Sequence, residues 1–164
     1  MYVVHNVKNK EKTLNNMTEG KTVAVVMCTY NGEKFLREQL DSILRQTYPI
    51  SEIIVQDDCS TDSTVAILRS YAARDGRVRV IVNEHNLGFN RNFRSAVMKA
   101  TADFVAISDQ DDVWMPDKIE RQVEAIGQYN ICYSDHLRGT TLESAHTVSP
   151  RCSLEALMFG GFAG

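Results

Sequence analysis

Three acidic side chains stand within one short segment of the chain, Asp109, Asp111 and Asp112. Neighbouring carboxylates repel one another, so this arrangement favours a bound cation. Carboxylate oxygens are hard ligands that suit Mg²⁺ or Mn²⁺, and Mg²⁺ commonly binds one or two carboxylates together with phosphate oxygens and water. Alternatively, the three acids cap the helix predicted to begin near Pro116, because the positive end of a helix dipole attracts negative charge. The residue types alone leave both interpretations open.

A second acidic pair, Asp57 and Asp58, follows a short apolar run. A carboxylate at this place can accept a hydrogen bond from a base N–H, such as N3 of uracil or thymine, or bind a ribose hydroxyl. The alternative is that Asp58, Ser60 or Asp62 caps the next helix. We expect Asp62 to be the cap and Asp58 to be the group that contacts a ligand.

The segment Thr29, Tyr30 and Asn31 offers an aromatic ring that could stack on a base, together with a hydroxyl and an amide. A plain turn before a helix explains the same three residues. Taken alone, this signal is weak.

Gly88 and Asn92 lie where a third helix is predicted to begin, and helix N-termini attract anions. Arg91 lies between them and could pair with a phosphate. An ordinary surface arginine is the simpler interpretation of that residue.

The elements that must position these groups alternate regularly along the chain. Short β-branched runs predict strands buried on both faces, and helical patterns of apolar residues separate them. This alternation predicts an α/β fold, a Rossmann-like, mostly parallel, doubly wound sheet with helices on both faces. Ligands of such sheets bind at the carboxyl ends of the strands, where the residues above would lie. The predicted strands cover 23–28, 52–56, 78–82, 103–107 and 131–134.

Composition narrows the class of protein. With 164 residues, 43% hydrophobic and 24% charged, the chain is long enough for one globular domain. The net charge of −3, with scattered basic residues, disfavours nucleic acid as a partner. The four cysteines lack the spacing of a zinc site or a disulfide framework, which suits a reducing compartment. No apolar run is long enough to cross a bilayer. We therefore expect a cytoplasmic protein, with room for a peripheral contact at the inner face of the membrane.

Several common nucleotide-binding and hydrolytic motifs are missing from the sequence. There is no G-x-G-x-x-G after the first predicted strand, which disfavours a dinucleotide oxidoreductase. There is no G-x-x-x-x-G-K-[ST] loop and no G-x-S-x-G elbow, which disfavours a P-loop enzyme and a serine hydrolase.

In combination, these loops resemble family 2 glycosyltransferases, the inverting enzymes of the GT-A fold. The resemblance extends over roughly 22–134, and its D-Q-D-D-x-W form looks most like bacterial enzymes that build surface polysaccharides, including rhamnosyltransferase-like members. The stretches that carry it are Val25 to Asn31, Glu33 to Tyr48, Glu52 to Asp62, Asn86 to Gly88 and Ser108 to Trp114.

The resemblance implies a role for each matching residue. Tyr30 would lie against the base, and Asp58 would contact the base or its ribose. Asp111 would be the direct ligand of Mg²⁺ or Mn²⁺, with Asp109 nearer the ribose or the donor sugar and Asp112 supporting them. The donor would be a UDP- or dTDP-sugar, and the acceptor a saccharide or a lipid-linked saccharide. The expected nucleotide-sugar site comprises Thr29, Tyr30, Asn31, Asp58, Gly88, Asn92, Asp109 and Asp111, of which Asp109 and Asp111 hold the metal.

The family's catalytic base is a carboxylate in the acceptor-side half, after the acidic loop. Asp135 and Glu143 follow that loop here, but we expect the base to lie beyond Gly164, so that 22–164 forms a C-terminally truncated donor-binding domain with an incomplete acceptor half. Residues 1–21 are expected to be a loose extension. Two rival functions stay open, a sugar-nucleotide-binding domain without turnover and, more remotely, a nucleotidyltransferase.

Overall fold

The structure is a computed structural model that describes residues 2–5, 20–126, 131–133, 136–138 and 146–148. The chain divides into two compact units, Met1–Cys132 and Tyr133–Gly164. The second unit contains a two-stranded antiparallel sheet of β7 (His136–Arg138) and β8 (His146–Val148). All the site residues predicted from the sequence lie in the first unit.

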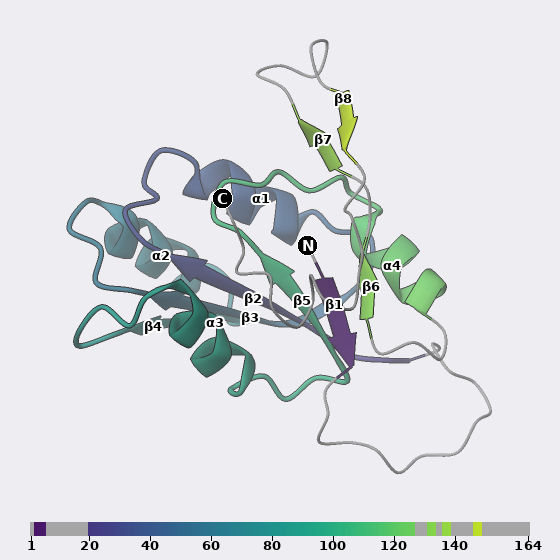
Figure 1. The fold of residues 1–164 in the computed structure, drawn as a ribbon, viewed down its shortest axis with the longest axis horizontal. Helices are drawn as coiled ribbons and strands as arrows, with labels where there is room; N and C mark the ends of the chain where they lie inside the picture. Colours follow the sequence, from purple (N-terminus) through teal and green to yellow (C-terminus); the bar gives the residue numbers. More distant parts are fainter. Residues whose placement is uncertain (1, 6–19, 127–130, 134–135, 139–145, 149–164) are drawn as a thin grey trace. The chain divides into compact units, whose positions relative to one another are not determined.

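The main sheet has six strands in the order β4-β3-β2-β5-β1-β6 (Figure 1). Three pairings follow the predicted parallel pattern, β2 with β3, β2 with β5 and β3 with β4, whereas β1 runs antiparallel to β5. Within the N-terminal segment that we expected to be loose, four residues therefore form a strand of the sheet, between β5 and β6. The strands are β1 (Tyr2–His5), β2 (Val23–Thr29), β3 (Ile50–Asp57), β4 (Val78–Val82), β5 (Phe104–Ser108) and β6 (Ile131–Tyr133).

Helices cover both faces of the sheet, as the sequence predicted. Alternate side chains of β2 point to opposite faces. Val25 and Met27 pack with residues of α1, α2 and α4, whereas Ala24 and Val26 pack with α3. The unbroken apolar run of β2 is explained by this burial on two sides. The helices are α1 (Leu36–Leu44), α2 (Thr64–Ala72), α3 (Phe89–Val97) and α4 (Lys118–Ile126).

The strand β2 marks the switch point of the sheet. From β2 the chain proceeds outward through β3 to β4 and then returns to β5 on the other side of β2. The register places Thr29 opposite Asp57 and Met27 opposite Ser108, so the carboxyl ends of β2, β3 and β5 lie at one level. Crevices at such switch points are where open α/β sheets bind their ligands.

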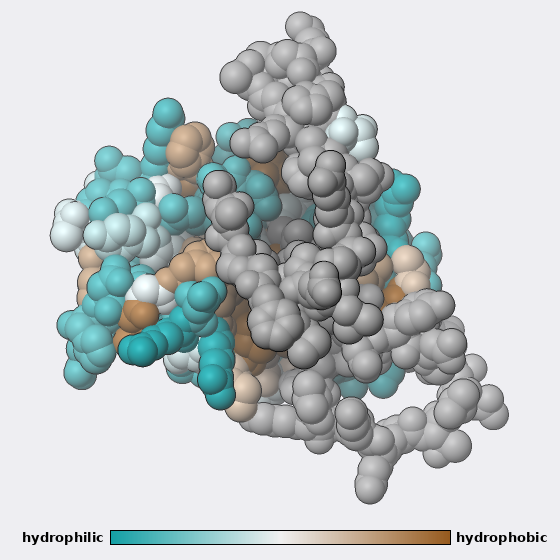
Figure 2. Space-filling view, viewed as in Figure 1, coloured by the Kyte–Doolittle hydropathy of each residue, from teal (hydrophilic) through white to brown (hydrophobic). Residues whose placement is uncertain are grey.

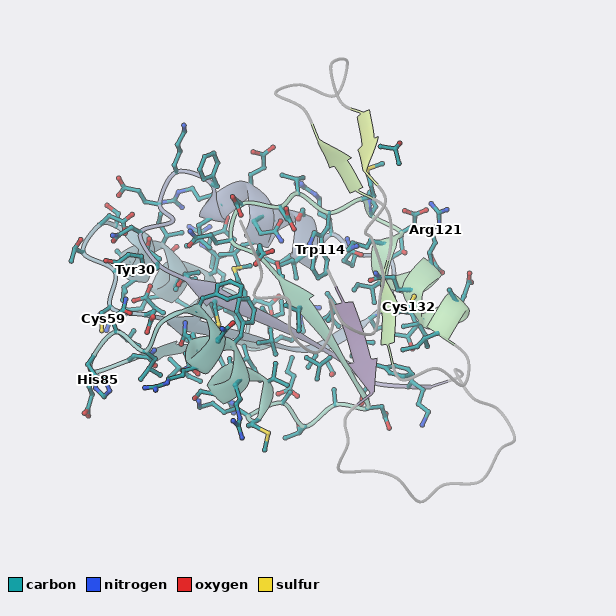
Figure 3. The ribbon with its side chains drawn as sticks, viewed as in Figure 1. Tyr30, Cys59, His85, Trp114, Arg121 and Cys132 are labelled. Atoms are coloured by element: carbon teal, nitrogen blue, oxygen red, sulfur yellow. The ribbon has the colours of Figure 1, made fainter. Side chains whose placement is uncertain are left out.

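Figure 3 shows the same edge with its side chains. Tyr30, Cys59 and His85, which follow β2, β3 and β4, lie at one end of the sheet. Hydrophilic side chains predominate over α2 and along α4 in the space-filling view (Figure 2). Within the ranges that the structure describes, no helix combines the length and apolar character that a bilayer crossing needs.

Candidate functional site

The loops after β2 and β5 are joined by the side-chain amide of Gln110. The Tyr30 backbone N–H donates to Gln110 Oε1 at 3.0 Å, and Gln110 Nε2 donates to the Tyr30 carbonyl at 3.2 Å. Both polar groups of one peptide segment are thereby satisfied by one side chain. The Tyr30 side chain itself is 51% exposed, so its ring remains available to a ligand.

Gly32 lets Gln110 approach the loop after β2. A Cβ placed on Gly32 would lie less than 3.0 Å from the Gln110 carboxamide oxygen. The missing Cβ therefore serves close packing of the Gln110 amide and not an unusual backbone angle, since the only described glycines with positive φ are Gly20 and Gly88.

Asn31 joins the loop after β2 to the loop after β3. Its φ is +49°, a left-handed conformation that asparagine tolerates better than most residues. Its N–H donates to Ser60 Oγ at 2.8 Å, and its side-chain oxygen accepts from the Thr61 N–H at 2.9 Å. Thr29 is buried, and its hydroxyl donates to Asp57 at 2.9 Å. Both residues therefore have structural roles, and direct ligand contacts from them stay a prediction.

Asp58 binds the loop that precedes α3. It is only 4% exposed, yet it faces backbone donors at the edge of the sheet. Its Oδ1 accepts from the Leu87 N–H at 2.7 Å, and its Oδ2 accepts from the Gly88 N–H at 2.9 Å. Asp58 and Gly88, both predicted site residues, are thus in direct contact.

Asn92 lies beneath this loop with only 2% of its surface exposed. Its side-chain oxygen accepts from Asn83 at 2.8 Å, and its Nδ2 donates to the Gln56 carbonyl at 3.1 Å. The structure gives Asn92 a supporting position, and a direct donor contact from it remains a prediction.

The acidic segment 109–112 directly follows β5, and its three carboxylates all reach solvent. Their side-chain oxygens accept no hydrogen bond and form no ion pair with any residue that the structure describes. Partial burial raises the pKa of Asp109, and the charges of Asp112 and Asp111 raise it further. The repulsion expected from the sequence is therefore present, and a cation would relieve it.

Helix capping does not account for these acids. The Ile119 N–H in the first turn of α4 donates to Gln46 Oε1 at 3.0 Å, and the Lys118 N–H donates to the Met115 carbonyl at 3.1 Å. By contrast, Asp62 Oδ1 accepts from the N–H of Thr64, the first residue of α2, at 2.9 Å. The predicted cap, Asp62, therefore contacts the start of α2 but lies one residue before the N-cap position, which is Ser63.

Helix α1 holds both ends of the acidic segment. Residues three and four apart share a helix face, so Gln39 and Ser42 lie on one face of α1. Gln39 Nε2 donates to the Ser108 hydroxyl, just before the segment, and the Trp114 N–H, just after it, donates to Ser42 Oγ at 3.0 Å. Two residues after the end of α1, Gln46 Nε2 donates to the Met115 carbonyl at 2.7 Å. We name the side chains of Gln39, Ser42 and Gln46 the polar stripe.

The donor set at 109–112 fits a hard divalent cation that is only partly bound by protein. No group of three or more histidine, cysteine, aspartate or glutamate side chains forms a closed metal cluster within the described part of the chain. Mg²⁺ rarely needs such a cluster, because phosphate oxygens and water complete its shell. Asp111 and Asp109 are the residues that would hold the ion.

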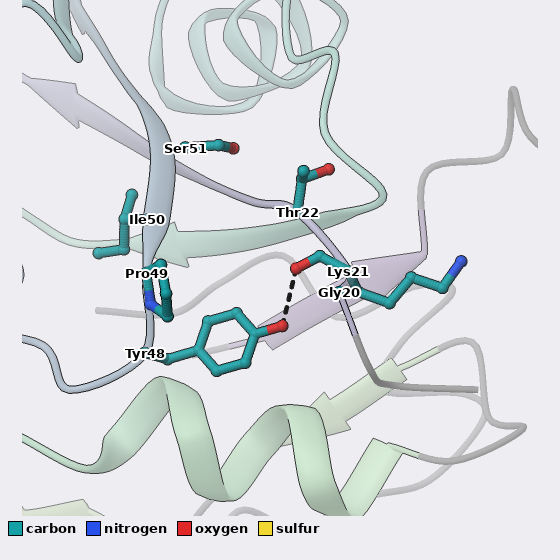
Figure 4. A pocket seen from close by; sticks show the side chains of 7 residues that line it. All are labelled: Gly20, Lys21, Thr22, Tyr48, Pro49, Ile50 and Ser51. Atoms are coloured by element: carbon teal, nitrogen blue, oxygen red, sulfur yellow. Dashed lines mark hydrogen bonds between the residues drawn. The ribbon is translucent and has the colours of Figure 1, made fainter. Parts of the chain in front are cut away.

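A separate pocket of about 380 Å³ lies at the other end of the sheet, among residues before and at the start of β2 and β3 (Figure 4). Within it, the Tyr48 hydroxyl donates to the Lys21 carbonyl at 2.7 Å. The pocket lies at the amino ends of β2 and β3, whereas every predicted site residue lies at or after the carboxyl end of a strand, so the pocket and the predicted site do not coincide. Its lining is Gly20, Lys21, Thr22, Tyr48, Pro49, Ile50 and Ser51.

The fold and the edge described above define a class of protein. A mostly parallel sheet that carries an exposed ring, a buried carboxylate and unpaired acids at its switch point is typical of enzymes that bind a nucleotide with a divalent cation. The sequence matches the profile of glycosyl transferase family 2 over residues 24–155. The chain belongs to this family.

Individual relatives agree with that membership. The chain is 36% identical over 112 residues to the putative teichuronic acid biosynthesis glycosyltransferase TuaG of Bacillus subtilis, a match that covers 68% of the chain and 44% of TuaG. The structure of S. aureus TarS 1–349 in complex with UDP is similar with a TM-score of 0.59 and 31% identity, over 64% of this chain and 32% of that one. The mannosyltransferase PcManGT from Pyrobaculum calidifontis, in complex with GDP-Man and Mn²⁺, is similar with a TM-score of 0.60 and 29% identity, over 65% and 32% of the two chains. The GT-A fold is confirmed by these similarities, and the match spans less than half the length of each relative.

Sequence reasoning did not assign a role to several residues that organise this edge. Gln110 lies between the acids and was overlooked because it carries no charge, although its place inside the segment was a signal. Asn83 directly follows β4, as Asp58 follows β3, and that position was the available signal. For Gln39 and Ser42 the signal was the polar spacing beside the apolar face of α1.

Proposed function

We propose that this chain binds a nucleoside diphosphate sugar at the carboxyl ends of β2, β3 and β5 and serves in the transfer of that sugar, with inversion, to an acceptor hydroxyl. The observation that carries the proposal is the acidic segment 109–112, whose exposed carboxylates accept no hydrogen bond from the described residues, while burial and then the charges of Asp112 and Asp111 raise the pKa of Asp109. Two similar structures contain UDP in one case and GDP-Man with Mn²⁺ in the other, which supports this kind of ligand.

Each residue's part in binding follows from its surroundings. The exposed ring of Tyr30 lies against the base, and Asp58 accepts a hydrogen bond from a base N–H or a ribose hydroxyl. Asp111 and Asp109 would hold Mg²⁺ or Mn²⁺ through their carboxylate oxygens. When bound, the cation supplies Lewis-acid stabilisation of the departing diphosphate. Gly88 presents its backbone at the loop that borders the donor.

The donor is proposed to be a UDP- or dTDP-sugar and the acceptor a saccharide or lipid-linked saccharide, in polysaccharide synthesis in the cytoplasm or at the inner face of the membrane. The printed role of TuaG in teichuronic acid biosynthesis supports a polysaccharide product. The catalytic base is not among the residues assigned here. Asp135 and Glu143 lie outside the described residues, as does any residue beyond Gly164.

Calorimetric titration tests the binding step. UDP, dTDP and GDP are titrated into the chain with Mn²⁺, with Mg²⁺ and with a chelator, and at least one nucleotide is expected to bind more tightly with the metal. Asp111→Asn should remove the metal-dependent part of that affinity. Asp117→Asn is the matched control, because it makes the same charge change at a half-buried residue just before α4, which forms only a long ion pair with Arg121 at 3.7 Å.

Two outcomes would count against the proposal. Asp111→Asn with wild-type affinity in Mn²⁺ would overturn the metal assignment. Binding of radiolabelled donor without any hydrolysis or transfer, with or without acceptor, would favour the alternative of a binding domain without turnover. A ligand present at a hundred times its dissociation constant adds about 2.7 kcal/mol of stability, so thermal shift is a suitable first screen of donors.

A further inference from the structure

A continuous chain of side-chain hydrogen bonds leads from Lys99, which follows the C-terminal end of α3, to Asp58. The Lys99 ammonium donates to Gln56 Oε1 at 2.8 Å, and Gln56 Nε2 donates to Asn83 Oδ1 at 2.9 Å. Asn83 Nδ2 then donates to Asp58 Oδ1 at 2.8 Å. We name these four side chains the relay. It begins two residues after the end of α3 and ends at the predicted ligand-binding carboxylate.

The lysine fixes the direction of every bond in the relay. An ammonium can only donate, so the carbonyl oxygen of Gln56 must face Lys99 and its NH₂ group must face Asn83. The oxygen of Asn83 must then face Gln56, which leaves its NH₂ group for Asp58. The Asn83 NH₂ group also donates to Asn92 Oδ1 at 2.8 Å, so both of its hydrogens are used.

Burial makes a reversed amide costly. Gln56 is 1% exposed and Asn92 is 2% exposed, so a misdirected amide in this region would face an unsatisfied acceptor without water to replace it. The order of donors and acceptors is therefore maintained by the packing as well as by the lysine.

At its end the relay delivers a donor to Asp58. Asp58 also receives the N–H groups of Leu87 and Gly88, the second of which is its only Oδ2 donor among the described residues. A carboxylate has about four acceptor positions, so one position on Oδ2 remains for a donor brought by a ligand. Because all of its described partners are donors, the Asp58 carboxylate is oriented to accept one more hydrogen bond.

We propose that Lys99, acting through Gln56 and Asn83, is a positioning residue that keeps Asp58 oriented as a hydrogen-bond acceptor for the N–H of a nucleotide base. This inference rests on the proposed function, in which Asp58 contacts the base or its ribose. Of these two contacts, the inference favours the one with the base. Lys99 itself does not touch the ligand. A base without a suitable N–H gains nothing from the arrangement.

The test compares UDP with 3-methyluridine diphosphate, in which a methyl group replaces the N3 hydrogen, by calorimetry with Mn²⁺. The wild-type chain is expected to prefer UDP by about tenfold or more, since a hydrogen bond to a charged group contributes about 1.5–3 kcal/mol. Gln56→Glu has nearly the same shape but presents an oxygen to Asn83, which must then turn its own oxygen toward Asp58. Lys99→Met removes the donor that begins the relay. Both variants should lose most of the preference for UDP while their affinity for the methylated nucleotide changes little.

The ratio of the two affinities separates positioning from general damage, because a loss of fold lowers both. Lys21→Met is the matched control for Lys99→Met, since it removes a lysine that contacts Asp103 at the other end of the sheet, and it should keep the wild-type ratio. Thermal unfolding checks that each variant is folded. If Gln56→Glu does not fold, the comparison is made with Lys99→Met alone.

Folded variants that retain the wild-type preference for UDP would overturn the relay while leaving the proposed function intact. A wild-type chain that binds both nucleotides equally would overturn the relay together with the contact between Asp58 and the base. A wild-type chain that binds neither nucleotide would defeat the proposed function and this inference together.

Discussion

The side-chain amide of Gln110 makes two hydrogen bonds to the backbone of Tyr30, one through its oxygen at 3.0 Å and one through its nitrogen at 3.2 Å. The residue that separates Asp109 from Asp111 therefore also fixes the loop that carries the exposed aromatic ring. The part of the site expected to hold the metal and the part expected to hold the base are connected by this one side chain.

Replacing Gln110 should loosen both parts at once. Gln110→Ala removes two partly exposed hydrogen bonds, so the free energy of unfolding should fall by about 1 kcal/mol. This value is the lower limit for two bonds that each contribute about 0.5–1.5 kcal/mol. The affinity for UDP with Mn²⁺ should fall as well. Urea denaturation and calorimetry measure the two effects, and an unchanged affinity would contradict the connection.

Gly32→Ala should act through the same contact. The added methyl group would displace the Gln110 amide, so the variant should lose about the same stability as Gln110→Ala. In the double variant the two losses should not add, because only one contact is available to lose. A double-mutant cycle by urea denaturation checks this, and full additivity would show that Gly32 serves another purpose.

The variant Cys59→Gly should be more stable than the variant Cys59→Ala. Its φ of +68° is left-handed, and a residue with a Cβ pays about 1–2 kcal/mol for this conformation. Cys59→Ala loses the thiol contact with the Asn83 carbonyl at 3.2 Å and keeps the strain, whereas Cys59→Gly loses the contact and the strain together. We expect the glycine variant to be about 1 kcal/mol more stable than the alanine variant in urea denaturation. Equal stabilities would show that the strain is small.

The stability of the fold should fall in alkaline solution because of Cys28. Burial, and then the charges of Asp58 and Asp109, raise the pKa of this thiol from 9.0 to about 12. In the unfolded chain the thiol ionises first, so its contribution to stability is complete below pH 9.0 and is lost as the pH rises from 9.0 toward 12. Near the middle of that window the loss should be about 1–2 kcal/mol.

Cys28→Ala isolates this effect from the other groups that titrate at high pH. Its stability relative to the wild-type chain should be lowest at pH 8 and should recover as the pH increases, when both are measured by urea denaturation. A constant difference between the two chains over that range would show that the thiol ionises normally.

Much of the fold could be predicted because its signals are local. The apolar run of β2 is buried on both faces, and the alternation of strands and helices determined which loops share an edge. The strand Tyr2–His5 was not predicted, because pairing with β5 is a tertiary contact over a long stretch of sequence and four residues carry little pattern. Charge made Asp58, Asp109 and Asp111 easy to select as site candidates.

The supporting residues could not be selected in the same way. Gln56 reads as one more residue of a strand, and nothing in its local sequence shows that it contacts Lys99, which is 43 positions away. Neutral amides act here through the positions of their hydrogen-bond partners, and those positions are determined by tertiary packing. The roles of Asn31 and Asn92 show the same limit, since their side chains are used inside the protein as well as near the predicted ligand.

The polar stripe, on α1 and just after it, contacts the residues on either side of the acidic segment and makes no hydrogen bond to the acids themselves. The residues that anchor this loop to the polar stripe are therefore different from the acids that are expected to contact the ligand. Substitutions at 109, 111 or 112 can alter ligand preference without unfolding their support, so the edge is suited to diversification among relatives that use different donors.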